Sequence, residues 1–127
     1  MWKFNNVITN FSQDEMACHC PCKCSAMSEE FMVKLQELRD KCGFALPVSS
    51  GYRCVSHNEK SGGHPTSGHL SGEAADLKVE RTKARITIQY ALEMGFSVGI
   101  SQKGEGRFVH VDTKKRHSGK PNLWSYA

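Results

Sequence analysis

The spacing of hydrophobic residues predicts an amphipathic helix over residues 29–42. Apolar side chains recur every three or four positions, so they line one face of a helix. The residues with this spacing are Phe31, Leu35, Leu38 and Cys42. Ser28 is a suitable N-cap, glutamates occupy the first turn, and Gly43 is a suitable residue to end the helix.

A second helix and several strands are predicted further along the chain. Thr82 can cap a helix that runs to about Met94, and its apolar positions are Ala84, Ile88, Ala91 and Leu92. Strands are predicted over residues 48–53, 74–79, 96–101 and 107–113. This alternation of helices and short strands predicts an α+β fold with a small antiparallel sheet and flanking helices.

Two polar segments are predicted to be loops. Residues 10–26 have no helical or strand period, and residues 54–72 are rich in Gly, Ser, His and Asn, with room for one helical turn after Ser56. A long polar loop is uncommon in a compact domain unless it is functional. No segment has the composition of a linker, so residues 1–127 are expected to form a single domain that includes the cysteine-rich N-terminal segment 1–26.

Composition and charge exclude several classes of protein. The chain has 39% hydrophobic and 24% charged residues, which is ordinary for a globular domain. Its formal net charge of +4 is too small for a dedicated nucleic-acid binder. It has no apolar run of about 20 residues and no apolar core of a signal peptide near the start. We therefore expect no nucleic-acid partner, no membrane insertion and synthesis in the cytoplasm without a signal peptide.

The six cysteines leave several interpretations open. Cys18, Cys20, Cys22 and Cys24 alternate strictly, which would place all four on one side of an extended segment. Their spacing differs from that of zinc fingers, whose ligand pairs are separated by two to four residues. A structural metal site, disulfides to Cys42 or Cys54, and reduced thiols that only pack are the three alternatives.

Two histidines and an aspartate are candidates for a catalytic metal site. His69, Asp76 and His110 supply two imidazoles and one carboxylate, and catalytic zinc sites commonly use three such ligands and leave one position open. His110 and Asp112 are two residues apart on a predicted strand and therefore share a face. If the strand that carries Asp76 is their neighbour, all three side chains lie on that face.

Five motifs together resemble a known family. They are Ser50-Gly51-Tyr52-Arg53, His57-Asn58, Gly62-Gly63, His69-x-x-Gly72-x-Ala74-x-Asp76 and Phe108-Val109-His110-Val111-Asp112. Over roughly residues 8–125 they closely resemble peptidase family M15, the zinc D-Ala-D-Ala carboxypeptidases, and especially its short phage and prophage branch. Hedgehog signalling domains share the metal pattern and the fold, so the resemblance implies a hedgehog/DD-peptidase-like fold.

The resemblance also implies roles for individual residues. His69, Asp76 and His110 would hold one catalytic Zn²⁺, which would activate water and polarise the scissile carbonyl. Asp112 would be the general base, and Arg53 would place a cation near the oxyanion or the substrate carboxylate. The residues expected to shape the site are Tyr52, His57, Asn58 and Ser67. Several relatives have a carboxylate where this chain has Arg107, so Glu105 and Glu73 are alternative bases.

The function implied is that of a zinc metallopeptidase that hydrolyses peptidoglycan stem peptides. It would be a D-Ala-D-Ala carboxypeptidase or an endolysin-type endopeptidase, and the bond it cuts stays open. The resemblance further implies a monomer of bacterial phage or prophage origin that reaches the cell wall after release or as part of a virion. The alternative is a non-catalytic zinc-binding structural module of a phage particle on the same fold.

Overall fold

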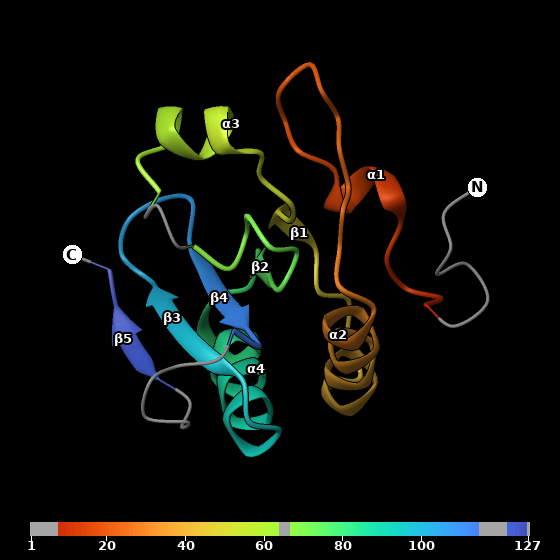
Figure 1. The fold of residues 1–127 in the computed structure, drawn as a ribbon. Helices are drawn as coiled ribbons and strands as arrows, with labels where there is room; N and C mark the ends of the chain where they lie inside the picture. Colours follow the sequence, from red (N-terminus) through yellow and green to blue (C-terminus); the bar gives the residue numbers. More distant parts are fainter. Residues whose placement is uncertain (1–7, 64–66, 115–121, 127) are drawn as a thin grey trace.

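One five-stranded sheet organises the part of the chain that the structure describes (Figure 1). The computed structural model describes residues 8–63, 67–114 and 122–126. Their helices are α1 (Gln13–Met16), α2 (Glu29–Cys42), α3 (Val55–Lys60) and α4 (Arg81–Glu93). Their strands are β1 (Val48–Ser50), β2 (Ala74–Leu77), β3 (Ser97–Ser101), β4 (Phe108–Asp112) and β5 (Leu123–Ser125). This confirms the predicted α+β class.

The sheet is antiparallel except at one edge. Its strand order is β1-β2-β4-β3-β5, and β5 pairs with β3 in the parallel direction. The sequence prediction contained no strand beyond residue 113, so the parallel edge differs from the wholly antiparallel sheet that was expected. The missed strand has three residues, which is short for a strand of a globular protein.

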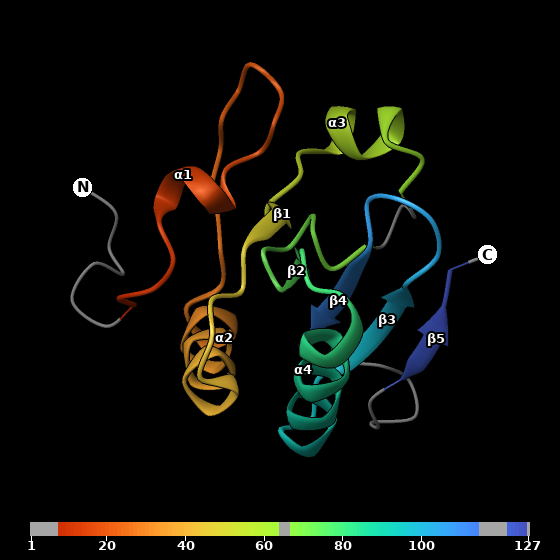
Figure 2. The same ribbon diagram turned by 180° about the vertical axis from the view of Figure 1, so that it is seen from behind.

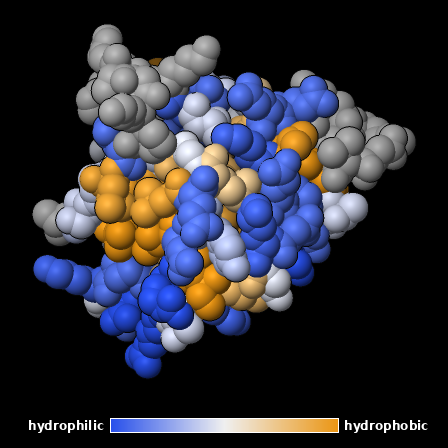
Figure 3. Space-filling model, turned by 90° about the horizontal axis from the view of Figure 1, so that it is seen from below, coloured by the Kyte–Doolittle hydropathy of each residue, from blue (hydrophilic) through white to orange (hydrophobic). Residues whose placement is uncertain are grey.

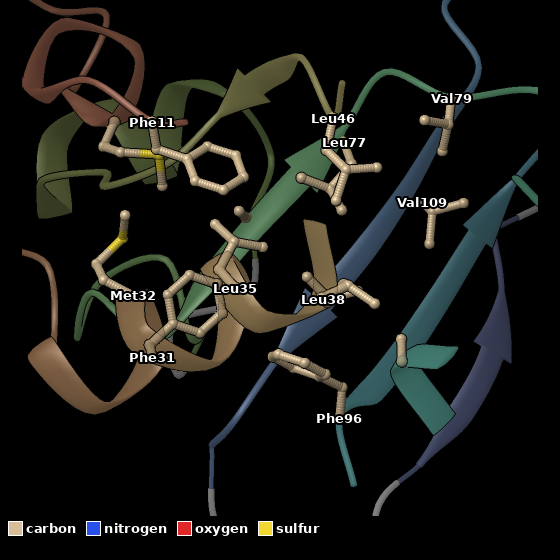
Figure 4. Close-up of a cluster of buried hydrophobic side chains, with 14 of the residues drawn as sticks. Phe11, Phe31, Met32, Leu35, Leu38, Leu46, Leu77, Val79, Phe96 and Val109 are labelled. Atoms are coloured by element: carbon tan, nitrogen blue, oxygen red, sulfur yellow. The ribbon is translucent and has the colours of Figure 1, made fainter. Parts of the chain in front are cut away.

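Two amphipathic helices cover one face of the sheet. The strands β3 and β4 lie in front of α4 in Figure 1 and behind it in Figure 2. Helix α2 begins and ends as predicted: the Ser28 hydroxyl accepts a hydrogen bond from the Phe31 N–H at 3.3 Å, and Gly43 adopts a left-handed φ of 73°. In Figure 4, Phe31, Leu35 and Leu38 of α2 point toward residues of the sheet. Alternate residues of β2 and β4, including Leu77 and Val109, complete this core.

Several element boundaries differ from the prediction. Residues 10–26 include α1, whose first turn is closed by reciprocal hydrogen bonds between Ser12 and Glu15. Helix α3 is longer than the single turn expected after Ser56. Helix α4 begins at Arg81 and has Glu80 rather than Thr82 as its N-cap residue, because the chain is already helical at Thr82.

The outer surface of the helices is largely polar. Seen from below, hydrophilic side chains surround a hydrophobic patch (Figure 3). Leu92, predicted to belong to the apolar face of α4, is 38% exposed, whereas Thr87 is buried and donates a hydrogen bond to the carbonyl oxygen of Lys83. Among the described residues, no helix combines the length and the apolar character that crossing a membrane requires.

Candidate metal centre and active site

The candidate site is built on one row of residues that crosses the sheet from edge to edge. Ser50 of β1 pairs with Asp76 of β2, and Asp76 pairs with His110 of β4. His110 pairs in turn with Gly99 of β3, and Gly99 pairs with Trp124 of β5. Cross-strand partners in a pleated sheet point to the same face. The apolar neighbours of these residues along β2 and β4 point to the opposite face, toward α2 and α4.

Three metal-competent side chains converge on this row. His69, Asp76 and His110 each offer a ligand atom, and all three atoms lie within 4.8 Å of one another. The Oδ1 atom of Asp76 is 2.9 Å from Nδ1 of His110 and 3.3 Å from Nε2 of His69. The three residues are 1%, 8% and 5% exposed, in chain order. The face shared by Asp76, His110 and Asp112, expected from the strand period, is present in the structure.

Each imidazole is oriented by a further acceptor. Nδ1–H of His69 donates to the Gly51 carbonyl oxygen at 2.6 Å, which leaves Nε2 directed at Asp76. Nε2–H of His110 donates to Oδ2 of Asp112 at 2.7 Å, which leaves Nδ1 directed at Asp76. Metal-binding histidines almost always donate the other ring N–H to a carbonyl or a carboxylate, and that bond fixes the ring. Both rings therefore have the orientation that a metal site needs.

Electrostatic interactions shift the pKa values of Asp76 and His110 in the direction that favours their charged forms. Burial favours the neutral acid of Asp76, but hydrogen bonds from His110 and His69 outweigh burial and lower the pKa of the carboxyl. Burial also favours neutral His110, but its hydrogen bonds to Asp112 and Asp76 outweigh burial and raise the pKa of the imidazole. A buried anion therefore lies between two imidazoles, and such an arrangement attracts a cation.

The donor set fits a zinc ion. Ligand atoms at about 2.1 Å from one ion in tetrahedral geometry lie about 3.4 Å apart. The observed separations of 2.9 and 3.3 Å between the carboxylate oxygen and the two nitrogens are close to that value. Two imidazoles and one carboxylate are also a composition found in catalytic zinc centres.

The loop before β2 carries His69 into the site. The Ser67 hydroxyl accepts a hydrogen bond from the backbone N–H of His69 at 3.2 Å. At the other end of the loop Gly72 adopts a φ of 72°, and its carbonyl oxygen accepts a hydrogen bond from the Ser28 N–H at 2.9 Å. A side chain at Gly72 would overlap the Ala26 carbonyl oxygen, so this position requires glycine. The loop is thus fixed on both sides of His69.

Arg53 lies beside the three candidate ligands with its guanidinium held in place. Its donors reach the Ser50 hydroxyl at 3.1 Å, Oδ1 of Asn58 at 3.2 Å and Oδ2 of Asp76 at 3.5 Å. The backbone N–H of Arg53 donates a hydrogen bond to the His69 carbonyl oxygen at 3.1 Å. Arg53 therefore contributes a positioned positive charge, and Asn58, which is 2% exposed, acts through it.

An open cavity of about 690 Å³ lies over the site. Its described lining includes Arg53, Ser67, His69, Asp76, His110 and Asp112. Phe108, Trp124 and Tyr126 form an aromatic side of the same cavity, with ring centroids 5.3 Å apart for Phe108 and Tyr126 and for His110 and Trp124. The two tail aromatics were missed as site residues. Their two-residue spacing, with Leu123 and Ser125 alternating, is the strand signal that could have identified them.

Other predicted site residues lie outside this cavity. Tyr52 packs against the hydrophobic core, and the ring of His57 lies 6.0 Å from that of His19. Neither of the alternative bases lines the cavity: Glu105 is exposed in the turn between β3 and β4, and Glu73 accepts a hydrogen bond from Ser71 at 2.5 Å. Of the three predicted bases, the structure brings only Asp112 to the cavity.

Comparison with protein families identifies a match to most of the chain. The family described as Peptidase M15 matches residues 9–112, a span that contains all three candidate ligands together with Arg53 and Asp112. A search of curated proteins finds no match to this chain.

Proposed function

The chain belongs to the peptidase M15 family, and we propose that it is a zinc-dependent peptidase that hydrolyses peptide bonds in peptidoglycan stem peptides. The observation that carries the proposal is the convergence of His69, Asp76 and His110 beneath an open cavity. These residues would hold the ion. A zinc ion bound there would supply a Lewis acid for the scissile carbonyl and a source of nucleophilic water near neutral pH.

Arg53 supports the binding of a negatively charged or carbonyl oxygen of the substrate. Its guanidinium lines the cavity, its side chain is 14% exposed, and its three donors are fixed by Ser50, Asn58 and Asp76. A cation that is already oriented costs no reorganisation when charge develops on the substrate. Stem peptides carry carboxylates at their ends and side chains, so we propose that Arg53 positions the substrate.

The aromatic side of the cavity supports the binding of a peptide chain. Phe108, Trp124 and Tyr126 line it together with the charged groups, so the cavity has both an aromatic and a polar part. Such cavities bury the apolar part of a ligand while a few polar groups fix its orientation. We propose that the aromatic part packs against the backbone and small alanine side chains of the stem peptide.

Asp112 has contacts that favour a positioning role. It is 2% exposed, Oδ2 accepts from His110 at 2.7 Å, and Oδ1 accepts from the Lys114 N–H at 3.2 Å. A carboxylate that accepts the second N–H of a histidine ligand orients that ligand and raises its basicity. We therefore propose that Asp112 positions His110. The general-base role predicted from the resemblance stays a prediction, which the variant Asp112→Asn can test.

The experiment is digestion of purified peptidoglycan by the zinc-loaded protein, followed by mass spectrometry of the released fragments. Release should stop with a chelator and return with Zn²⁺. Asp76→Ala and His110→Ala should abolish zinc binding at this site and the release of fragments, whereas the exposed control Glu105→Gln should retain both. The masses of the fragments identify the bond. Zinc binding without release from any peptidoglycan type would contradict the proposal and favour the non-catalytic structural module.

A further inference from the structure

A second group of metal-competent side chains lies apart from the proposed active site. The sulfur atoms of Cys18, Cys20, Cys22 and Cys54 all lie within 4.8 Å of one another. The separations are 3.4 Å for Cys18 and Cys20, 2.9 Å for Cys20 and Cys22, 3.4 Å for Cys20 and Cys54, and 3.8 Å for Cys18 and Cys54. We call these four residues the thiol cluster. None of them lines the cavity over His69, Asp76 and His110.

The fold brings the cluster together from two distant segments. Three members lie in the loop between α1 and α2, and the fourth is the N-cap residue of α3 (Figures 1 and 2). The Cys18 N–H donates to the Cys24 carbonyl oxygen at 2.7 Å, and Lys23 has a left-handed φ of 48°, so the loop doubles back. The expectation that four alternating cysteines share one side is therefore wrong. Cys24 lies outside the cluster, and Cys54 takes the fourth place.

Burial does not explain this arrangement. Cys18 is buried at 2% exposure, but Cys20 and Cys54 are half-buried and Cys22 is exposed. Cysteines that only pack belong among the most buried residues of a protein. Gathering four thiols near the surface yields little hydrophobic stabilisation, so the cluster requires another reason.

The separations fit a single metal ion. Four sulfur atoms at about 2.3 Å from one zinc ion in tetrahedral geometry lie about 3.8 Å apart. Three of the four separations given above are between 3.4 and 3.8 Å. Thiolate ligands favour soft or borderline ions, and a four-sulfur tetrahedral set is typical of structural zinc. Sulfur atoms this close leave no room for a multinuclear iron–sulfur cluster between them.

Two backbone N–H groups approach sulfur atoms of the cluster, as they do in thiolate sites. The Cys54 N–H approaches the Cys18 sulfur at 3.5 Å, and the His57 N–H approaches the Cys54 sulfur at 3.5 Å. Hydrogen bonds of this kind orient metal ligands and offset the charge on thiolates. They also connect the loop to the first turn of α3.

We propose that Cys18, Cys20, Cys22 and Cys54 bind a structural Zn²⁺ that ties the α1–α2 loop to the start of α3. The ion completes a closed tetrahedral set and has no open position for substrate. Because Cys54 directly follows Arg53, the ion also fixes the backbone beside that guanidinium. The proposal of this site does not depend on the proposed peptidase activity.

Metal content and cobalt spectroscopy of the whole protein, purified under reducing conditions, test the proposal. Wild type should bind two zinc ions per chain. Cobalt in the thiol cluster should give sulfur-to-cobalt charge-transfer bands, which a site of two histidines and an aspartate cannot give. The variant His110→Ala should lose one ion and keep these bands. A failure of the proposed thiol site can therefore be distinguished from a failure of the proposed active site.

Two loop cysteines form a matched pair for this test. Cys22→Ser and Cys24→Ser change exposed thiols two residues apart, and only Cys22 belongs to the cluster. Cys22→Ser leaves three thiolates, so it should weaken zinc binding at the cluster and reduce the charge-transfer bands, whereas Cys24→Ser should change neither. Equal effects in the two variants, or zinc affinity and bands of Cys22→Ser that match those of wild type, would overturn the assignment.

The wild type alone also tests the proposal if a variant fails to fold. An organomercurial that blocks thiols should release one zinc equivalent, measured with a chromophoric chelator, and should lower the melting temperature of the protein. Release of no zinc from a protein whose thiols have all reacted would overturn the proposal. Disulfides among these cysteines in the reduced preparation, or iron in place of zinc, would overturn it as well.

Discussion

Replacing Asp112 by asparagine separates the two roles that this carboxylate could have. The substitution keeps the shape of a side chain that is 2% exposed and removes its charge. The affected contact is the 2.7 Å hydrogen bond that Oδ2 accepts from Nε2 of His110. The amide group of asparagine can accept that bond only through its single oxygen, and a neutral acceptor holds an imidazole less strongly than a carboxylate.

The expected effect is on metal affinity. Removing a partner that orients a metal ligand typically costs 10–100-fold in affinity, or about 1.4–2.7 kcal/mol. We therefore expect Asp112→Asn to weaken zinc binding by about 10–100-fold. Because the ligands themselves are intact, most of the hydrolysis should return when zinc is added in excess.

A competition titration against a chromophoric chelator measures the affinity, and hydrolysis at saturating zinc measures the activity. Asp14→Asn is the matched control, because Asp14 is exposed in the first turn of α1. Unchanged zinc affinity with a loss of kcat of about 10²–10⁴-fold would refute the positioning role. That result would identify Asp112 as the general base instead.

Three further predictions concern the cavity and the core. Gly99→Ala places a methyl carbon 2.7 Å from the indole of Trp124, so KM should rise while zinc content stays constant; an unchanged KM would argue against an aromatic substrate wall. Arg53→Lys loses bonds to three partners and should lower kcat/KM by about 10–100-fold with zinc retained, and wild-type kcat/KM would remove Arg53 from the site. Leu35→Ala empties a fully buried position of α2 and should reduce the free energy of unfolding by about 2–5 kcal/mol in chemical denaturation; a loss below about 1 kcal/mol would mean that the core can collapse around it.

Local periodicity explains which parts of the structure could be predicted. The helical spacing of Phe31, Leu35 and Leu38 predicts α2 because a helix repeats within a few residues. The two-residue strand period likewise places His110 and Asp112 on one face. These features depend only on neighbours in sequence. The capping pair Ser12 and Glu15 of α1 is a local signal of the same kind, but residues 10–26 were predicted to be a loop and α1 was missed.

Pairing between distant segments was not predictable from such patterns. The strand period gives the face of Trp124 but not its partner Gly99, which lies across a parallel pair at the sheet edge. Alternation likewise could not show that a turn removes Cys24 from the thiol cluster or that Cys54 replaces it. In both cases the contact is decided by how the chain closes on itself, and this is a property of the tertiary fold.

The two proposed metal sites should differ in how far the protein depends on them. Behind the row that carries Asp76 and His110, the same strands bury apolar residues such as Leu77 and Val109 against α2 and α4. A slip of one residue would exchange these faces, so the core alone fixes the register of the strands. Loss of the ion proposed at His69, Asp76 and His110 should therefore abolish activity while the sheet stays folded. In the α1–α2 loop, Cys18 is the buried thiol. Loss of the ion proposed in the thiol cluster should therefore release this loop before the rest of the fold. Limited proteolysis between α1 and α2 should detect the release.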